Sequence, residues 1–130
     1  MSRPISRAQL ATRWVLGPLF IAAGVMHFVR PEFYARMVPP YLPWPRELVF
    51  ASGLAEVVGG LALFVPRLRV AAAWGLIALL VAVFPANVHM ALNPDEFPNI
   101  PPLALWIRLP LQAVLIAWAH WFTRREESRV

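Results

Sequence analysis

The stretch ASGLAEVVGGLALFVP, residues 51–66, carries one carboxylate, Glu56, in an otherwise apolar sequence. The apolar run that contains it, residues 48–65, has about the length that a helix needs to cross a bilayer. A carboxylate at the centre of a bilayer costs about 3 kcal/mol or more unless it is neutralised or paired. We therefore expect the other helices to supply partners for Glu56, and we expect a functional site around it.

The composition is that of a membrane protein, with 59% hydrophobic and 15% charged residues in a chain of 130. Four apolar runs, residues 10–29, 48–65, 70–92 and 103–122, each approach the roughly 20 residues of a membrane-spanning helix. None of them alternates with the two-residue period of a barrel strand. The sequence predicts an all-α membrane protein of one domain, residues 1–130. It would be a four-transmembrane-helix bundle with outer loops at residues 30–47 and 93–102.

The basic residues predict how the bundle is oriented. All 12 of them are arginines at or near helix ends, which fits headgroup contact and topology rather than nucleic-acid binding. Eight would share one side of the membrane: Arg3, Arg7, Arg13, Arg67, Arg69, Arg124, Arg125 and Arg129. Four would lie on or near the other side: Arg30, Arg36, Arg46 and Arg108. The positive-inside rule then predicts that both termini are cytoplasmic.

Polar residues within the spans gather in the outer half of the predicted bundle. They are His27 on the first helix, Ser52 and Glu56 on the second, Asn87 and His89 on the third, and Arg108 and Gln112 on the fourth. We interpret these seven residues as candidates for ligand binding or proton handling in one polar chamber. The two outer loops, both rich in proline, would cover that chamber.

Helical spacing indicates which residues face the centre. In the second helix, Ser52 and Glu56 share a face with Ala51, Ala55 and Gly59, and small residues allow close helix packing in lipid. In the third helix, Asn87 and His89 lie two positions apart, so their side chains point about 200° apart around the helix axis. They cannot both point inward, and we expect His89 to be the one that does.

Prolines shape the predicted helices and the first loop. Pro85 and Pro110 should bend the third and fourth helices and free the carbonyls of Val81 and Trp106. In the first loop we expect a short turn at residues 31–37. An extended segment that includes Pro45 should follow, lying across the outer mouth of the bundle.

Structural explanations compete with each of these functional ones. Glu56 could form an ion pair with Arg108 that only holds two helices together. His27 and His89 could be wetted by headgroups, Gln112 could bond to another helix, and His120 fits an interface anchor.

A metal site is not expected. His27, His89 and Glu56 are suitable ligand types, but they lack tight ligand spacing and a nearby arginine would repel a cation. The chain has no cysteine and no haem or nucleotide motif, so a thiol centre within it is excluded.

Five short motifs resemble the DoxX-like membrane proteins, a superfamily with the small subunit of thiosulfate:quinone oxidoreductase and the MauE proteins. They are GxxHF (residues 24–28), PxxY (31–34), SGxxExxGG (52–60), FPANVHMA (84–91) and LWxRLPLQ (105–112). The resemblance covers essentially the whole chain. It implies a multi-pass protein of the bacterial cytoplasmic (inner) membrane that is linked, in some relatives, to electron transfer to quinone or to redox homeostasis.

Three functions follow as hypotheses. The first is a redox-associated or quinone-interacting accessory subunit, in which quinone is the candidate cofactor. The second is a small proton-coupled transporter with Glu56 as the proton-exchanging group. The third is a structural or assembly protein without chemistry of its own. The expected surroundings are the lipid bilayer, with other membrane or redox proteins or further copies of this chain as candidate partners, and no nucleic acid.

Overall fold

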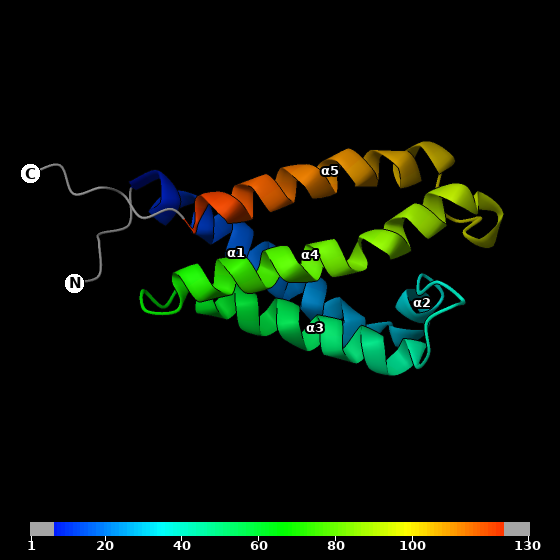
Figure 1. Ribbon diagram of the computed structural model, residues 1–130, viewed down its shortest axis with the longest axis horizontal. Coiled ribbons are helices and arrows are strands. Elements are labelled where there is room, and N and C mark those ends of the chain that lie inside the picture. Colours follow the sequence, from blue (N-terminus) through cyan, green and yellow to red (C-terminus); the bar gives the residue numbers. More distant parts are fainter. Residues whose placement is uncertain (1–6, 124–130) are drawn as a thin grey trace, which may run out of the picture.

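A computed structural model describes residues 7–123 of the chain. Its elements are α1 (Arg7–Val29), α2 (Pro31–Ala35), α3 (Pro45–Ala62), α4 (Arg69–Leu92), the 3₁₀ helix η1 (Pro94–Glu96) and α5 (Pro102–Trp121). No strand occurs within residues 7–123, so the predicted all-helical fold is confirmed. The long helices α1, α3, α4 and α5 run back and forth along one axis, with α2 and η1 at the same end (Figure 1).

Three of the long helices have the length and apolar composition of membrane spans. They are α1 over Ala11–Val29, α4 and α5. The fourth, α3, is more polar because its 18 residues include Arg46, Glu47 and Glu56. Four arginines behind the orientation prediction lie outside the described residues: Arg3, Arg124, Arg125 and Arg129.

The helix bounds lie close to the predicted ones, with the largest difference in α3. This helix begins at Pro45 and ends at Ala62, earlier at both ends than the predicted run of residues 48–65. The expectation that Pro45 belongs to the extended loop is wrong. A proline at the first helical position loses no hydrogen bond and already has a helical φ angle. The preceding residue, Trp44, turns the chain with a left-handed φ of 52°.

Glycines bring α1 and α3 into close contact. A Cβ atom placed on Gly53 would lie 2.8 Å from the Gly24 carbonyl oxygen and 2.7 Å from the Cβ of His27. Nearer the other end, a Cβ on Gly60 would lie 2.8 Å from the Gly17 carbonyl oxygen. The two backbones can approach this closely only because these positions lack side chains.

The predicted small-residue face of α3 is right for Gly59, where an added Cβ would lie 2.6 Å from Leu76 on α4, but wrong for its two alanines. Ala51 and Ala55, expected to face a neighbouring helix, are exposed, and Gly53 and Gly60 make the contact with α1. Ser52 and Glu56 lie beside that contact and face the interior of the bundle.

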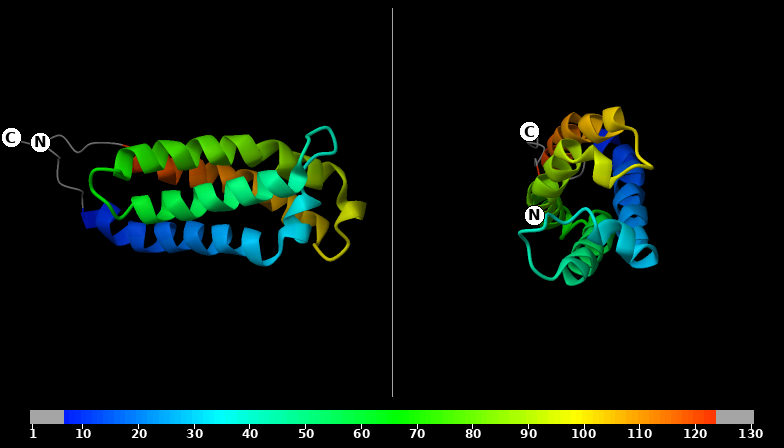
Figure 2. Two further views of the ribbon diagram at one scale, coloured as in Figure 1. Left: turned by 90° about the horizontal axis from the view of Figure 1, so that it is seen from below. Right: turned by 90° about the vertical axis from the view of Figure 1, so that its right-hand side faces the viewer.

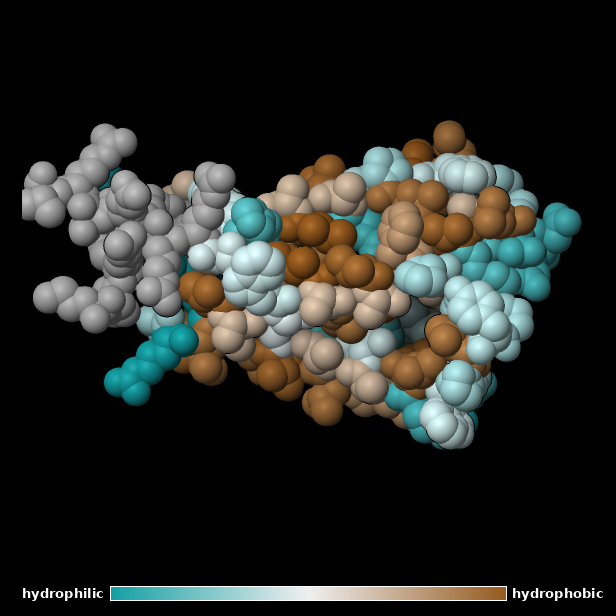
Figure 3. Space-filling view, in the orientation of Figure 1, coloured by the Kyte–Doolittle hydropathy of each residue, from teal (hydrophilic) through white to brown (hydrophobic). Residues whose placement is uncertain are grey.

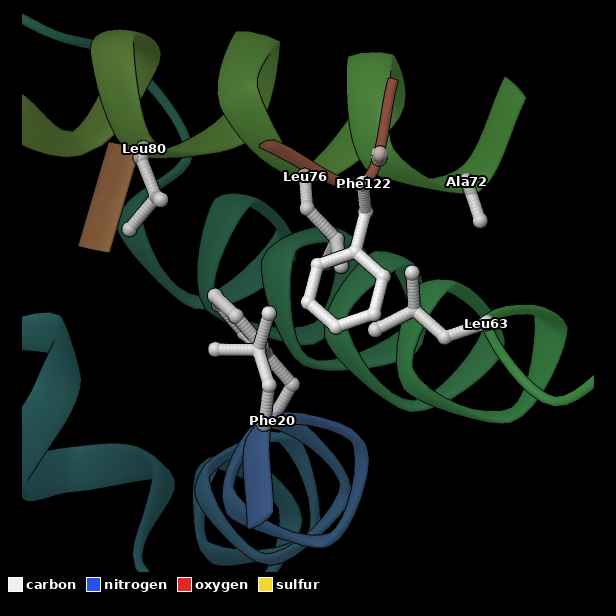
Figure 4. Close-up of a cluster of buried hydrophobic side chains, with 8 residues drawn as sticks. Phe20, Leu63, Ala72, Leu76, Leu80 and Phe122 are labelled. Atoms are coloured by element: carbon white, nitrogen blue, oxygen red, sulfur yellow. The ribbon is translucent and has the colours of Figure 1, made fainter. Parts of the chain in front are cut away.

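An apolar cluster closes the end of the bundle where α1 begins and α5 finishes. The cluster joins α1, the residue after α3, α4 and the residue after α5, whose side chains point toward one another: Phe20, Leu63, Leu76 and Phe122 (Figure 4). Leu63 and Phe122 are fully buried. This end of the bundle is consequently filled by side chains.

A second apolar cluster lies at the opposite end, near α2 and η1. It contains Met37, Met90, Ala91, Phe97 and Leu105. The end-on view in Figure 2 shows the four long helices around a common axis, with α2 and η1 nearest the viewer. The space around Glu56 lies between the two clusters.

The glycine contact can be tested by adding a single methyl group. Gly53→Ala should lower the free energy of unfolding by about 1–3 kcal/mol, because the new Cβ overlaps His27 and the α1 backbone. Gly75→Ala on α4 is the matched control, since a Cβ there meets nothing within 4 Å. It should leave stability unchanged or raise it, because alanine favours helices. Denaturant unfolding in detergent micelles measures both variants, and equal effects would contradict the packing described.

Candidate functional site

A cavity of about 410 Å³ lies between the two apolar clusters. Its volume falls within the range of about 300–1,000 Å³ that is usual for small-molecule sites. Residues from all four long helices, from α2 and from the segment after α2 line it. Its polar lining residues are His27, Tyr34, Ser52, Glu56, Asn87, Arg108 and Gln112. The structure thus brings together six of the seven residues that the sequence singled out.

Glu56 and His27 face each other across the α1–α3 contact. Oε2 of Glu56 lies 3.4 Å from Nδ1 of His27, and both side chains are only 13% exposed. However, Nδ1 also lies 2.7 Å from the Ala23 carbonyl oxygen, which can only accept a hydrogen bond, so Nδ1 donates there. Oε2 is buried without a hydrogen-bond partner among the described residues. A donor in the cavity, or a proton on the carboxyl group, would satisfy it.

Tyr34 on α2 completes this side of the cavity. Its ring stacks on the His27 imidazole, with centroids 4.1 Å apart and planes 16° from parallel. Burial raises the pKa of the Tyr34 hydroxyl above its ordinary value of 10.0, the Glu56 carboxylate raises it further, and the Arg108 guanidinium opposes them. The sequence analysis did not include Tyr34 among the candidate site residues, although the motif PxxY (residues 31–34), which ends in Tyr34, was a signal for it.

Arg108 approaches the cavity from α5. Its Nη1 donates a hydrogen bond to the sulfur of Met90 at 3.4 Å. Within residues 7–123, Arg108 forms no ion pair with a carboxylate, so the alternative in which it holds Glu56 is not what the fold contains. The Arg108 guanidinium therefore has hydrogen-bond donors left for a ligand, on the side of the cavity opposite α3.

Gln112 and Asn87 fasten α5 to α4. Asn87 Nδ2 donates to Gln112 Oε1 at 2.6 Å, and Gln112 Nε2 donates to the Leu80 carbonyl oxygen. This confirms the predicted interhelical bond of Gln112. The accepting carbonyl is that of Leu80, next to Val81, whose carbonyl Pro85 was expected to free. On α3, Ser52 donates to its own helix, to the Leu48 carbonyl oxygen at 2.8 Å.

His89 lies outside the cavity. Its Nε2 is 3.0 Å from Oε2 of Glu96, and its Nδ1 is 3.2 Å from Nδ2 of Asn93, near η1. The prediction that His89 rather than Asn87 faces the centre is therefore wrong.

The second proline-rich loop does not cover the chamber as expected. Met37, Val38 and Pro39 of the first loop line the cavity, whereas Phe97 of the second packs in the apolar cluster beside it.

His120 is exposed and meets the edge of Trp74, with ring centroids 5.6 Å apart.

The chemistry of the cavity suits a small group that accepts hydrogen bonds and has an apolar body. Tyr34 and Arg108 can donate, Glu56 can exchange a proton, and the remaining wall is largely aliphatic. Within the part of the chain that the structure describes, no three metal-ligating side chains come together.

The hydrogen bond between Asn87 on α4 and Gln112 on α5 predicts that the effects of replacing these two residues on stability depend on each other. Asn87→Ala and Gln112→Ala should each destabilise the protein, Gln112→Ala more, because it also loses the bond to the Leu80 carbonyl. The double variant should be less destabilised than the sum of the two by about 1 kcal/mol, as is usual for hydrogen bonds between membrane helices. Unfolding free energies of the wild type, the two single variants and the double variant, measured in micelles, complete the double-mutant cycle. Strictly additive effects would contradict the hydrogen bond between Asn87 and Gln112.

The surroundings of Tyr34 predict a spectroscopic titration. The chain has two tyrosines, so in the Tyr41→Phe variant Tyr34 alone contributes the ultraviolet absorbance of tyrosinate. Its midpoint should lie above pH 10.0, because burial and Glu56 disfavour the anion. Adding Glu56→Gln should lower the midpoint, and adding Arg108→Gln should raise it. A midpoint at or below 10.0, or shifts of the opposite sign, would refute this placement.

Comparison with known proteins gives a family match without an assigned activity. Neither a curated protein nor a solved structure matches the chain. A family model described as a domain of unknown function, DUF8561, matches residues 16–123. The match covers α1 from Leu16 onward, the other three long helices in full and every residue of the cavity. The chain belongs to this family, the domain of unknown function DUF8561.

Proposed function

We propose that the chain is a DoxX-like, four-span protein of the bacterial cytoplasmic membrane that binds the headgroup of a quinone as a redox-associated accessory subunit. The main support for this proposal is that four side chains from four different elements meet at one cavity with apolar walls: His27, Glu56, Tyr34 and Arg108. The resemblance of the sequence to the DoxX-like proteins points to the same chemistry.

The outward surface of α3 supports its assignment as the fourth span. Leu54, Val58 and Leu61 are 55–58% exposed, whereas Ser52 and Glu56 face inward. A helix in water would present polar residues outward, and an apolar outer face suits contact with lipid.

The arrangement of the arginines supports cytoplasmic termini. The start of α1, the α3–α4 connection and the end of α5 lie at one end of the bundle (Figure 1). Arg7, Arg13 and Arg67 are therefore at that end, where the positive-inside rule places the cytoplasm.

The donors of the cavity match the needs of a quinone. A quinone is a flat, largely apolar ring with two carbonyl oxygens that accept hydrogen bonds, and it takes up two electrons and two protons on reduction. Tyr34 and Arg108 would donate to a carbonyl, and the carboxyl group of Glu56 would donate or exchange a proton. Because the chain has no cysteine, the electrons would come from a partner protein.

Transport, the alternative with Glu56 as the proton-exchanging group, requires access from both sides of the membrane. The cluster around Phe20, Leu63 and Phe122 fills the bundle on the side away from α2. A transport cycle would have to separate these buried side chains, whereas ligand binding needs no such change. This difference favours a binding site.

Replacing Glu56 tests the proposal. Glu56→Leu should weaken binding of decylubiquinone about tenfold, the effect of losing one good hydrogen bond. Glu47→Gln on the exposed first turn of α3 is the control for loss of an acidic charge and should have no effect. Binding is measured at equilibrium in lipid nanodiscs, with the bound quinone quantified by its absorbance. If the wild type does not bind quinone, or if Glu56→Leu binds equally well, the proposed function fails.

The pH dependence of binding gives a second, independent readout. If the protonated carboxyl group of Glu56 donates to the quinone, affinity should fall as the pH rises and the proton is lost. Glu56→Gln keeps a donor that does not titrate, so its profile should be flatter. His27 from α1, Tyr34 from α2 and Arg108 from α5 also face the cavity, and α4 contributes no titratable group there. A wild-type profile identical to that of Glu56→Gln would exclude Glu56 as the donor.

A further inference from the structure

The rim of the cavity differs from its interior. Five residues both line the cavity and are exposed on the surface of the bundle, so they lie where it opens. They are Leu42, Leu48, Ala82, Pro85 and Leu111. All of them are apolar, whereas the polar lining residues are buried or half-buried. The cavity therefore opens through an apolar rim onto the side of the bundle.

Part of this opening lies between α3 and α4. Leu48 is 14 residues before the end of α3, and Ala82 is 13 residues after the start of α4. Because the two helices are antiparallel and joined by a short connection, these residues stand at about the same height. Figure 3 shows a hollow in this face toward the α2 end, bordered partly by hydrophobic (brown) and partly by pale, intermediate side chains.

The position of the rim along the bundle axis indicates whether it faces lipid or water. Leu48 is one turn into α3, beyond the charged pair Arg46 and Glu47, and Ala82 lies well within α4, a candidate membrane span. In the proposed topology this opening is surrounded by acyl chains rather than water. Leucine and alanine would present no barrier to an alkyl chain there.

We infer that the ligand of this cavity is a long-tailed amphiphile that enters sideways from the membrane. Its polar ring reaches Glu56, Tyr34 and Arg108, and its hydrocarbon tail leaves between Leu48 on α3 and Ala82 on α4. The inference rests on the proposed function and specifies it: the quinone is a lipid-dissolved one whose tail stays in the bilayer while its ring is bound.

Narrowing the opening tests this route. In Ala82→Trp the indole should occupy the gap, so binding of decylubiquinone should weaken at least about tenfold in nanodiscs, because packed sites tolerate added bulk poorly. Binding of the same ring without a tail should weaken much less, because the ring lies deeper, beside Glu56, Tyr34 and Arg108. Ala78→Trp is the matched control, one turn earlier on α4, exposed and outside the cavity lining, and it should bind both ligands normally. Because decylubiquinone partitions into the nanodisc lipid equally in every sample, this partitioning cancels when the affinities of the variants are compared.

A second variant protects the test against misfolding. Leu48→Trp narrows the gap from the α3 side and should reproduce the selective loss of the tailed ligand, while retained binding of the tail-less ring shows that each variant is folded. Equal loss of both ligands, or no loss in either variant, would overturn the inference and leave the proposed function standing. If the wild type binds neither ligand, the proposed function fails and the inference fails with it.

Discussion

The contact between the backbones of α1 and α3 is the constraint on which the site depends. Gly53 faces the Gly24 carbonyl and the Cβ of His27, and no larger residue fits there. This contact brings the imidazole within 3.4 Å of Glu56. On the other side Gln112 ties α5 to α4. Two tightly joined helix pairs meet in an apolar cluster at one end, and the space they enclose toward the other end is the cavity.

The polar groups of this cavity do not fully pair with one another. A bundle that used Glu56 only to hold its helices would pair the carboxylate fully, since a buried charge without partners is costly. Instead Oε2 of Glu56 has no hydrogen-bond partner among residues 7–123, and the guanidinium of Arg108 contacts the sulfur of Met90. The unpartnered carboxylate oxygen of Glu56 and the hydrogen-bond donors of Arg108 thus face one cavity. A carbonyl oxygen of a ligand would accept from Arg108, and a proton on the Glu56 carboxyl group would let that group donate to the ligand as well.

Hydropathy and helical spacing predicted the depth of the site residues but not their rotation. Six of the seven candidates meet because an apolar run places each polar residue to within about a turn along the bundle axis. Each residue, however, rotates a side chain by about 100° around its helix, so a small error in the assumed inward direction assigned Ala51 and Ala55 to the packing face with α1 in place of Gly53 and Gly60. Asn87 and His89, whose side chains point about 200° apart, were exchanged because of the same kind of error. Tyr34 was missed because its position depends on how α2 folds back onto α1.

We propose that the space around Glu56 binds the ring of a membrane-soluble quinone. An experimental structure of the protein in lipid nanodiscs with decylubiquinone tests it most directly. We expect density for the ring within hydrogen-bonding distance of Tyr34 or Arg108 and beside Glu56, with the tail leaving between α3 and α4. A direct Glu56–Arg108 ion pair in a cavity filled by side chains, with no density for the ligand, would contradict it.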